Sequence, residues 1–289
     1  MENNRIFNQK NLLKNAIRDV KLEKNDLLKR RKILNKWIRM HKDGTLKKQK
    51  EESLKDGFLL QIFGDVLKYV KITDSKEWNL AMELKTKIDG QKADGVLGFF
   101  NNKKESVRVV IELKGPYVDL EARQRRQGEN RTPIEQAFGY VPKYDGKCEW
   151  VIVSNFYEIR LYPSRNMSKY EIFNLDMLQE TENFQKFIYL LSKTALIGDN
   201  NDHIPKIKEL FDEDIRAEKK IEKNFYTLYK GIREKIFKNL LKNNKEINEN
   251  VILEKTQKLM DRFLFVVFAE SKGLLKKNSY NMIVKKGSS

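Results

Sequence analysis

Residues 92–114 read KADGVLGFFNNKKESVRVVIELK, and this stretch predicts a β-hairpin with reactive side chains at one end. Two apolar runs flank a polar turn, which is the pattern of two antiparallel strands joined by a short loop. Because side chains alternate along a strand, Glu112 and Lys114 should point to one face and Leu113 to the other. The hairpin would bring Asp94, at the start of its first strand, beside them.

These three side chains predict a site for Mg²⁺-dependent cleavage of a phosphodiester. The carboxylates of Asp94 and Glu112 are hard oxygen ligands of the kind that Mg²⁺ prefers. The amine of Lys114 can orient a water molecule or stabilise developing negative charge. The alternative is a purely structural ion pair in the core. The Glu112 strand is otherwise apolar and should be buried on both faces, where charges are costly unless they are paired or bound to metal.

Composition points to a polyanionic partner. The chain of 289 residues has 58 Lys and Arg against 41 Asp and Glu, a net charge of +17, which favours nucleic acid. The alternative is a generally lysine-rich composition. The single cysteine, Cys148, excludes a disulfide within the chain, and only two histidines argue against structural zinc. The N-terminus lacks a signal-peptide core and no apolar run is long enough to cross a membrane, so we expect a cytoplasmic protein.

Periodicity predicts the order of elements along the chain. The expected elements are helix over 1–40, a helix over 50–70, a strand over 79–87, the hairpin, a helix from 132, strands at 148–153 and 157–162, and helices from about 176. The fold class is therefore α/β, a mixed central sheet flanked by helices and followed by an all-helical region. The expected division is an N-terminal helical arm at 1–45, a central domain at 46–175 and a helical region at 176–289.

The clearest helix start lies at TPIEQAFGY. Thr132 is the expected N-cap, Pro133 takes the first helical position, and Glu135 completes a capping box. Gln136 and Tyr140, four residues apart, should share one face of this helix.

Two further groups of charged residues lie near the hairpin in sequence. The loop at 115–131 is polar, and its arginines could contact a phosphate backbone. These arginines are Arg123, Arg125, Arg126 and Arg131. Glu51 and Glu52 begin the helix over 50–70, where carboxylates favour the helix dipole. The functional alternative is that one of them reaches the metal site.

The last helical region carries a nearly continuous apolar stripe. Its members are Leu259, Met260, Phe263, Leu264, Val267 and Phe268. Such a stripe predicts a buried helix.

The site motifs together resemble the PD-(D/E)XK nuclease superfamily. Asp94 is followed by the Glu-x-Lys of residues 112–114, and Gln136 and Tyr140 form a Gln-x-x-x-Tyr element similar to that of the RecB-type branch. Ala93 stands where the superfamily usually has proline, a variation that it tolerates.

Longer segments resemble one group within that superfamily. KADGVLGFF, VIELKG, TPIEQAFGYVPKY and WVIVSNFYEIRLY are similar to the N-terminal endonuclease region of type IIG restriction–modification enzymes, over roughly residues 46–163. The segment KLMDRFLFVVFAESKGLL, at 258–275, resembles the helical connector that leads to their methyltransferase domain.

The resemblance implies a role for each site residue. Asp94 and Glu112 would ligate Mg²⁺, for which Mn²⁺ can substitute, and the backbone carbonyl of Leu113 would be a further ligand. Lys114 would position or activate the attacking water, and Gln136 would orient the lysine or the water.

Two more positions match the family pattern. Tyr140 would pack near the scissile phosphate. Glu52, or Glu51, would be the extra acid that related nucleases place on the preceding helix.

The implied activity is that of a type II site-specific deoxyribonuclease that cleaves double-stranded DNA, in restriction–modification and defence against phage. The chain contains no Gly-rich loop and no Asn-Pro-Pro-Tyr motif, so it holds no S-adenosylmethionine site. Methyltransferase and target-recognition domains would be supplied by a missing C-terminal part or by another chain. Many related nucleases work as transient dimers, and the sequence leaves open whether two copies must meet to cut both strands. The alternatives are a non-catalytic DNA-binding or scaffold module, and a fragment that is inactive without its partner domains.

Overall fold

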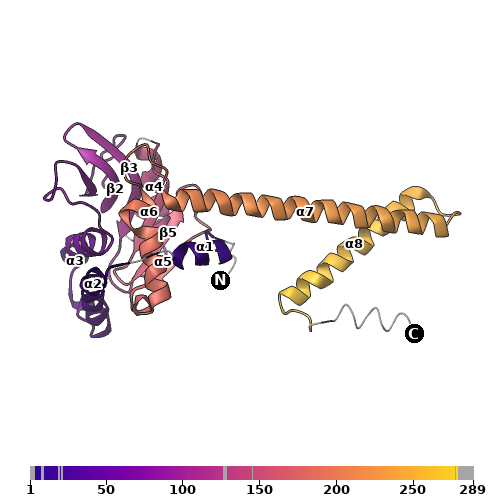
Figure 1. The fold of residues 1–289 in the computed structure, drawn as a ribbon, viewed down its shortest axis with the longest axis horizontal. Coiled ribbons are helices and arrows are strands. Elements are labelled where there is room, and N and C mark those ends of the chain that lie inside the picture. Colours follow the sequence, from indigo (N-terminus) through magenta and orange to yellow (C-terminus); the bar gives the residue numbers. More distant parts are fainter. Residues whose placement is uncertain are drawn as a thin grey trace. The chain divides into compact units, whose positions relative to one another are not determined.

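The chain folds into two compact units, Met1–Arg216 (unit 1) and Ala217–Ser289 (unit 2), which are described separately. Figure 1 shows their elements in a computed structural model of the protein. The described residues are 4–7, 10–18, 20, 22–125, 129–144, 146–276 and 278.

Unit 1 contains a six-stranded mixed sheet whose strand order follows the sequence. The strands are β1 (Trp78–Met82), β2 (Gly95–Asn101), β3 (Lys104–Leu113), β4 (Trp150–Ser154), β5 (Glu158–Pro163) and β6 (Glu171–Asn174). Only β3 and β4 pair in parallel, and each of the other neighbouring pairs is antiparallel. The mixed α/β sheet was predicted, but β6 was not, because four residues are too few to establish an alternating pattern.

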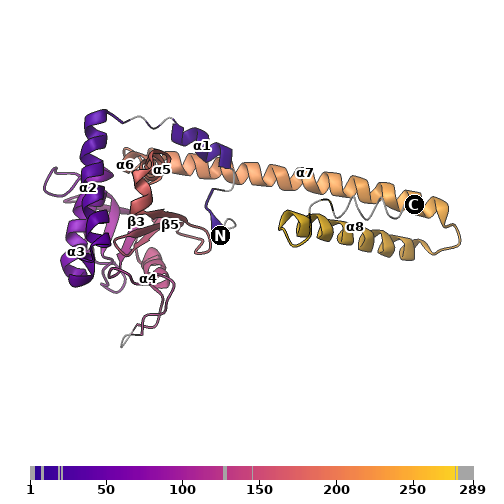
Figure 2. The same ribbon diagram turned by 90° about the horizontal axis from the view of Figure 1, so that it is seen from below.

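Helices cover both faces of this sheet. The elements of unit 1 are α1 (Lys10–Arg18), α2 (Lys24–Lys42), η2 (Leu46–Lys48), α3 (Glu51–Phe58), the π-helical segment η3 (Leu59–Val66), α4 (Pro133–Tyr140), η4 (Val141–Lys143), η5 (Leu175–Gln179), α5 (Thr181–Leu191) and α6 (Lys193–Leu196). Helix α4, which joins the two parallel strands, packs on one face. The main hydrophobic core, shared with α2, η3 and α5, lies on the other (Figure 2).

The alternation predicted for β3 is confirmed. Val110 belongs to a buried cluster that includes Tyr140 of α4, whereas Ile111 and Leu113 belong to the main core. Glu112, between those two residues, therefore has its side chain on the face that α4 covers.

A register shift interrupts the pairing of β2 with β3. Leu97 and Gly98 are adjacent, but their partners Val109 and Val107 are two residues apart, so β3 carries one extra residue. A Cβ atom at Gly98 would stand 2.1 Å from the carbonyl oxygen of Ser106, a distance that no side chain tolerates. Glycine is thus required at this bulge.

The N-terminal helices belong to the same core as the sheet. The indole of Trp37 in α2 packs against Phe58 at 5.1 Å and Phe156 at 6.2 Å between ring centroids. Helix α2 ends at Lys42, and Gly44 follows it with φ +73°, a conformation that glycine favours after a helix.

Unit 2 consists of the greater part of α7 (Lys206–Asn243) and of α8 (Glu249–Ser271). Gln257 of α8 links the two helices, donating a hydrogen bond of 2.7 Å to the hydroxyl of Tyr229 and accepting one from Arg233. The prediction of helices after residue 176 is confirmed. None of the described helices is both long and apolar enough to span a membrane.

The predicted burial of the α8 stripe is wrong. Met260 is buried, but four other members of that stripe are exposed, namely Leu259, Phe263, Val267 and Phe268. Each of two paired helices buries only one face against the other. A helix that is apolar around much of its circumference therefore leaves its remaining apolar side chains exposed to solvent.

Candidate functional site

The hairpin brings Asp94 to the end of β3, as the sequence predicts. Asp94 lies one residue before β2, and its Oδ2 accepts a hydrogen bond of 2.7 Å from the backbone N–H of Leu113. This contact ties the carboxylate to the strand segment that also carries Glu112 and ends before Lys114. The three predicted catalytic side chains thus meet at one end of the hairpin.

Glu112 and Lys114 form a buried ion pair. The Nζ of Lys114 lies 2.6 Å from Oε1 of Glu112, and the two residues are only 5% and 2% exposed. The pKa of Glu112 is raised to about 8, because burial and the charge of Asp94 raise it by more than Lys114 lowers it. Full ionisation of Glu112 at neutral pH therefore requires more positive charge nearby than Lys114 alone supplies.

A second lysine, which the sequence reasoning missed, occupies the acidic side of the site. The Nζ of Lys55 in α3 lies 2.8 Å from Asp94, 3.0 Å from Glu52 and 3.2 Å from Glu51. Burial acts to lower the pKa of Lys55, but the hydrogen bond and charge of Asp94, together with the two glutamates, raise it above its usual value.

Glu51 and Glu52 point in different directions. Glu51 is largely buried, and its Oε2 lies 3.3 Å from the place where a Cβ atom of Gly115 would stand, one residue beyond Lys114. The Glu52 side chain is 75% exposed. Of the two acids considered from the sequence, Glu51 lies closer to the end of β3.

Helix α4 begins with the predicted capping box. Thr132 Oγ1 accepts from the backbone N–H of Glu135 at 3.0 Å, and the Glu135 carboxylate accepts from the N–H of Thr132 at 2.8 Å. Gln136 donates to the Tyr140 hydroxyl at 3.3 Å and accepts from Gln124 at 2.9 Å. Both ends of the Gln136 amide are engaged, so the predicted orientation of Lys114 would require this side chain to rotate.

Tyr140 is electrostatically linked to the acids. Burial raises the pKa of its hydroxyl, the hydrogen bond from Gln136 acts to lower it, and the charges of Glu112 and Asp94 raise it again. The phenol therefore remains a neutral hydrogen-bond donor at neutral pH.

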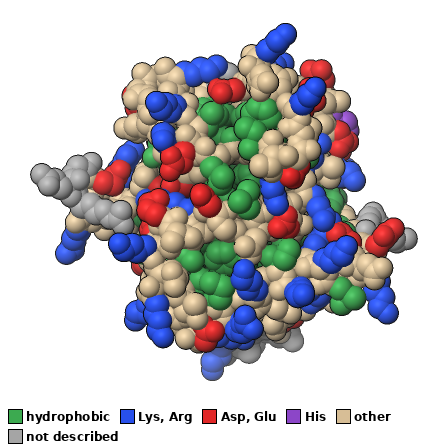
Figure 3. All heavy atoms as spheres, turned by 90° about the vertical axis from the view of Figure 1, so that its left-hand side faces the viewer, with side chains coloured by type: hydrophobic (Ala, Val, Ile, Leu, Met, Phe, Trp, Pro, Cys, Tyr) green, Lys and Arg blue, Asp and Glu red, His purple; other side chains and the backbone are tan. Residues whose placement is uncertain are grey.

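The arginines of the loop after β3 differ in their surroundings. Arg131 pairs with Glu129 at 2.6 Å, a contact that lowers the pKa of that glutamate to about 2. Arg123 and Arg125 are exposed, and Arg126 lies outside the described residues. In the space-filling view of Figure 3, lysines and arginines are spread over the face rather than gathered into one patch.

The side chains at the site have the right chemistry to bind a divalent cation, but in this structure they are not arranged around one. Asp94, Glu112 and Glu51 offer the oxygen ligands that Mg²⁺ and Mn²⁺ accept. Within the part of the chain that the structure describes, however, no three His, Cys, Asp or Glu residues gather as a metal-binding group. Lys55 and Lys114 instead form ion pairs with the acids.

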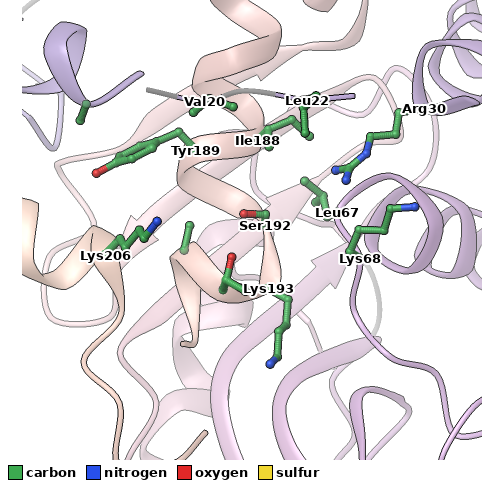
Figure 4. A pocket seen from close by; sticks show the side chains of 13 residues that line it. Val20, Leu22, Arg30, Leu67, Lys68, Ile188, Tyr189, Ser192, Lys193 and Lys206 are labelled. Atoms are coloured by element: carbon green, nitrogen blue, oxygen red, sulfur yellow. The ribbon is translucent and has the colours of Figure 1, made fainter. Parts of the chain in front are cut away.

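A cavity of about 410 Å³ lies elsewhere in unit 1, among α1, α2, α5 and α6 (Figure 4). Its walls combine apolar residues such as Leu22 and Ile188 with basic ones, including Arg30 and Lys206. Arg30 is already paired with Asp26 at 2.6 Å. The described residues that line this cavity include no acid, so it does not offer the carboxylate chemistry of the hairpin site.

Comparison of the chain with protein-family models, with curated proteins and with solved structures gives no match. The resemblance to the PD-(D/E)XK superfamily therefore stays a prediction that rests on the residues of the site.

Proposed function

We propose that the chain is a Mg²⁺-dependent DNA endonuclease of the PD-(D/E)XK type. One observation carries the proposal: Asp94, Glu112 and Lys114 converge at one end of the β2–β3 hairpin, with the Asp94 carboxylate bound to the N–H of Leu113 at 2.7 Å. Two carboxylates and an amine, two of them buried, form a costly arrangement that a purely structural role does not require.

The chain's own residues would divide the work. Asp94 and Glu112, with the Leu113 carbonyl, would hold the cation, and Glu51 is the nearer of the two additional acids. A bound divalent cation supplies Lewis-acid polarisation and lowers the pKa of a bound water. Lys114 would orient the attacking water and stabilise charge on the phosphate. Tyr140, as a neutral donor on α4, would contact the phosphate.

The net charge of +17 supports double-stranded DNA as the substrate, with Arg123, Arg125 and Arg131 on the loop after β3 available for phosphate contacts. Unit 2 exposes many large apolar side chains, a feature typical of surfaces that meet another domain. The methyltransferase and target-recognition domains implied by the family resemblance would take that place.

A second candidate is a DNA-binding module that does not cleave. The observation in its favour is that both acids are already neutralised, Asp94 by Lys55 and Glu112 by Lys114. In that case binding would depend on exposed arginines such as Arg125 and would fall steeply with salt.

The deciding experiment is cleavage of supercoiled plasmid with Mg²⁺ or Mn²⁺, compared with a chelator. The variants are Asp94→Asn and Lys114→Gln, which nearly preserve side-chain size. Asp65→Asn, which removes an acid paired with Lys71 outside the site, is the matched control. We expect metal-dependent nicking that falls by at least about a hundredfold in both site variants and stays unchanged in the control.

Nicking that persists in Asp94→Asn and Lys114→Gln would reject this site. If the wild type binds DNA with a steep salt dependence but cleaves it with neither metal, the non-catalytic candidate is favoured. Circular dichroism of each variant separates a lost activity from a lost fold.

A further inference from the structure

Lys55 stands out among the described basic residues of unit 1, because its one ammonium group contacts three carboxylates. Its Nζ lies within 3.2 Å of oxygens from Glu51, Glu52 and Asp94. The spacing i, i+3 and i, i+4 on α3 accounts for the two glutamates. The third contact crosses to the hairpin and joins two parts of the chain that are far apart in sequence.

Both oxygens of the Asp94 carboxylate are engaged. Oδ1 of Asp94 faces the ammonium at 2.8 Å, and Oδ2 accepts the Leu113 N–H at 2.7 Å. Lys55 thus occupies the space in front of Asp94 that a cation would enter. Two positive charges a few ångströms apart repel strongly in a site that is mostly shielded from water.

Lys55 has solvent and a partner other than Asp94 within reach. Its side chain is 15% exposed, so solvent is close, and a lysine stem has several rotatable bonds. Glu52, exposed at the rim, offers the ammonium a partner outside the site.

We propose that Lys55 is a built-in counterion that competes with the divalent metal for Asp94, and that it must swing away before the metal binds. This inference rests on the metal site of the proposed function and deepens it. Lys55 is then a positioning residue, which holds α3 and the hairpin together in the metal-free protein and sets the metal concentration at which the site fills.

The test is the affinity of the whole chain for Mn²⁺ without DNA, measured by titration calorimetry and by electron paramagnetic resonance of free Mn²⁺. In Lys55→Gln we expect the Kd for Mn²⁺ to fall by about tenfold or more, because a competing charge is gone. In Lys55→Arg we expect weaker binding, since the planar guanidinium clamps carboxylates more rigidly than an ammonium. This second variant retains the charge, so it remains informative if Lys55→Gln folds poorly.

Lys92→Gln is the matched control. It removes the same charge two residues from Asp94, but Lys92 is paired with Glu83 at the surface, and its Mn²⁺ affinity should equal that of the wild type. A second readout is thermal stability: with a chelator Lys55→Gln should melt below the wild type, and Mn²⁺ should raise its Tm by more than it raises that of the wild type.

Unchanged or weaker Mn²⁺ binding in Lys55→Gln would overturn the proposal, because Lys55 would then be neutral towards the metal or would help to bind it. Absence of saturable Mn²⁺ binding in every variant would overturn it as well. Tighter Mn²⁺ binding in Lys55→Gln, in a protein that never cleaves DNA, would uphold the counterion role and reject the nuclease.

Discussion

The two units distribute charged and apolar side chains in opposite ways. Unit 1 buries an acid and an amine, Glu112 and Lys114, beneath α4, whereas unit 2 leaves Phe265 and Phe268 largely exposed. Residues 217–289 also carry 17 Lys and Arg against 8 Asp and Glu, so this short segment contributes about half of the net charge. A sheet covered on both faces can enclose charges, whereas two paired helices cannot enclose even their own apolar residues. The comparison places the buried charged side chains in unit 1 and the exposed large apolar side chains in unit 2.

The largest expected contrast is between two phenylalanines. Phe58 is fully buried and packs against Trp37 and Phe156, so Phe58→Ala should cost about 3–5 kcal/mol of stability. Phe265 is 68% exposed, and Phe265→Ala should change stability by less than about 0.5 kcal/mol. Urea unfolding followed by tryptophan fluorescence reports unit 1, which holds all three tryptophans, and far-UV circular dichroism reports both units. Equal losses of stability in Phe58→Ala and Phe265→Ala would contradict the contrast between a buried core in unit 1 and exposed apolar side chains in unit 2.

The next contrast is between a buried and an exposed ion pair. Lys114→Ala strands Glu112 in the interior and should cost about 3 kcal/mol in a chelator, whereas replacing both residues with leucine should restore much of the loss. Lys258→Ala breaks the exposed pair with Glu254 in α8 and should leave the unfolding midpoint where it is. Chemical denaturation of the wild type and the three variants measures both effects. If Lys114→Ala costs little stability, water has access to Glu112 in the interior of unit 1.

A smaller contrast concerns two glycines. Gly98→Ala would press a methyl group onto the Ser106 carbonyl and should destabilise unit 1 by about 1–3 kcal/mol. Gly231 lies within α7 with open space around it, and Gly231→Ala should stabilise that helix by about 1 kcal/mol. Thermal melts followed by circular dichroism would detect these opposite signs, and a shift in the same direction for both variants would contradict the bulge.

The smallest effect is a pH dependence confined to unit 1, which contains both histidines. His41 stacks on Tyr157 at 3.9 Å, and burial lowers its pKa, with the charge of Asp176 opposing this. The folded state therefore binds the proton less readily than the unfolded chain. The stabilisation from neutral His41 is complete above pH of about 6.5 and is lost as the pH falls towards the lowered pKa. The Tm of His41→Gln relative to that of the wild type should rise as the pH falls from 7 to 6, and a difference that does not change with pH would count against this effect.

Features encoded locally could be predicted from the sequence. The hairpin follows from the alternation around Glu112, and the capping box follows from Thr132 and Glu135, because both depend on neighbours a few residues away. Asp94 could be placed beside Glu112 because the turn between their strands is short.

Features that depend on packing could not be predicted from the sequence. No spacing rule indicates that Lys55 reaches Asp94, because that contact depends on how the buried side of α3, including Phe58, seats against the sheet. The pair Glu51 and Lys55 is visible in the sequence as an i, i+4 match, but that pattern is common on solvent-exposed helices. The exposed stripe of α8 was missed for a related reason: composition reports how apolar a helix is, not how much partner surface is available to cover it.

The bulge between β2 and β3 makes the site sensitive to chain length. Arg108 is the extra residue, and it switches which face each later residue of β3 presents. Removing that single residue would restore regular pairing. The side chains on one side of the deletion, either those towards the polar turn or those towards Glu112, would then point to the opposite face of the sheet. Deleting Arg108, whose guanidinium donates to the carbonyl of Asn201 and takes no part in the site, would then exchange the faces that Glu112 and Leu113 present. Among variants of this chain, insertions and deletions within residues 98–111 should therefore be tolerated far less than substitutions at the same positions.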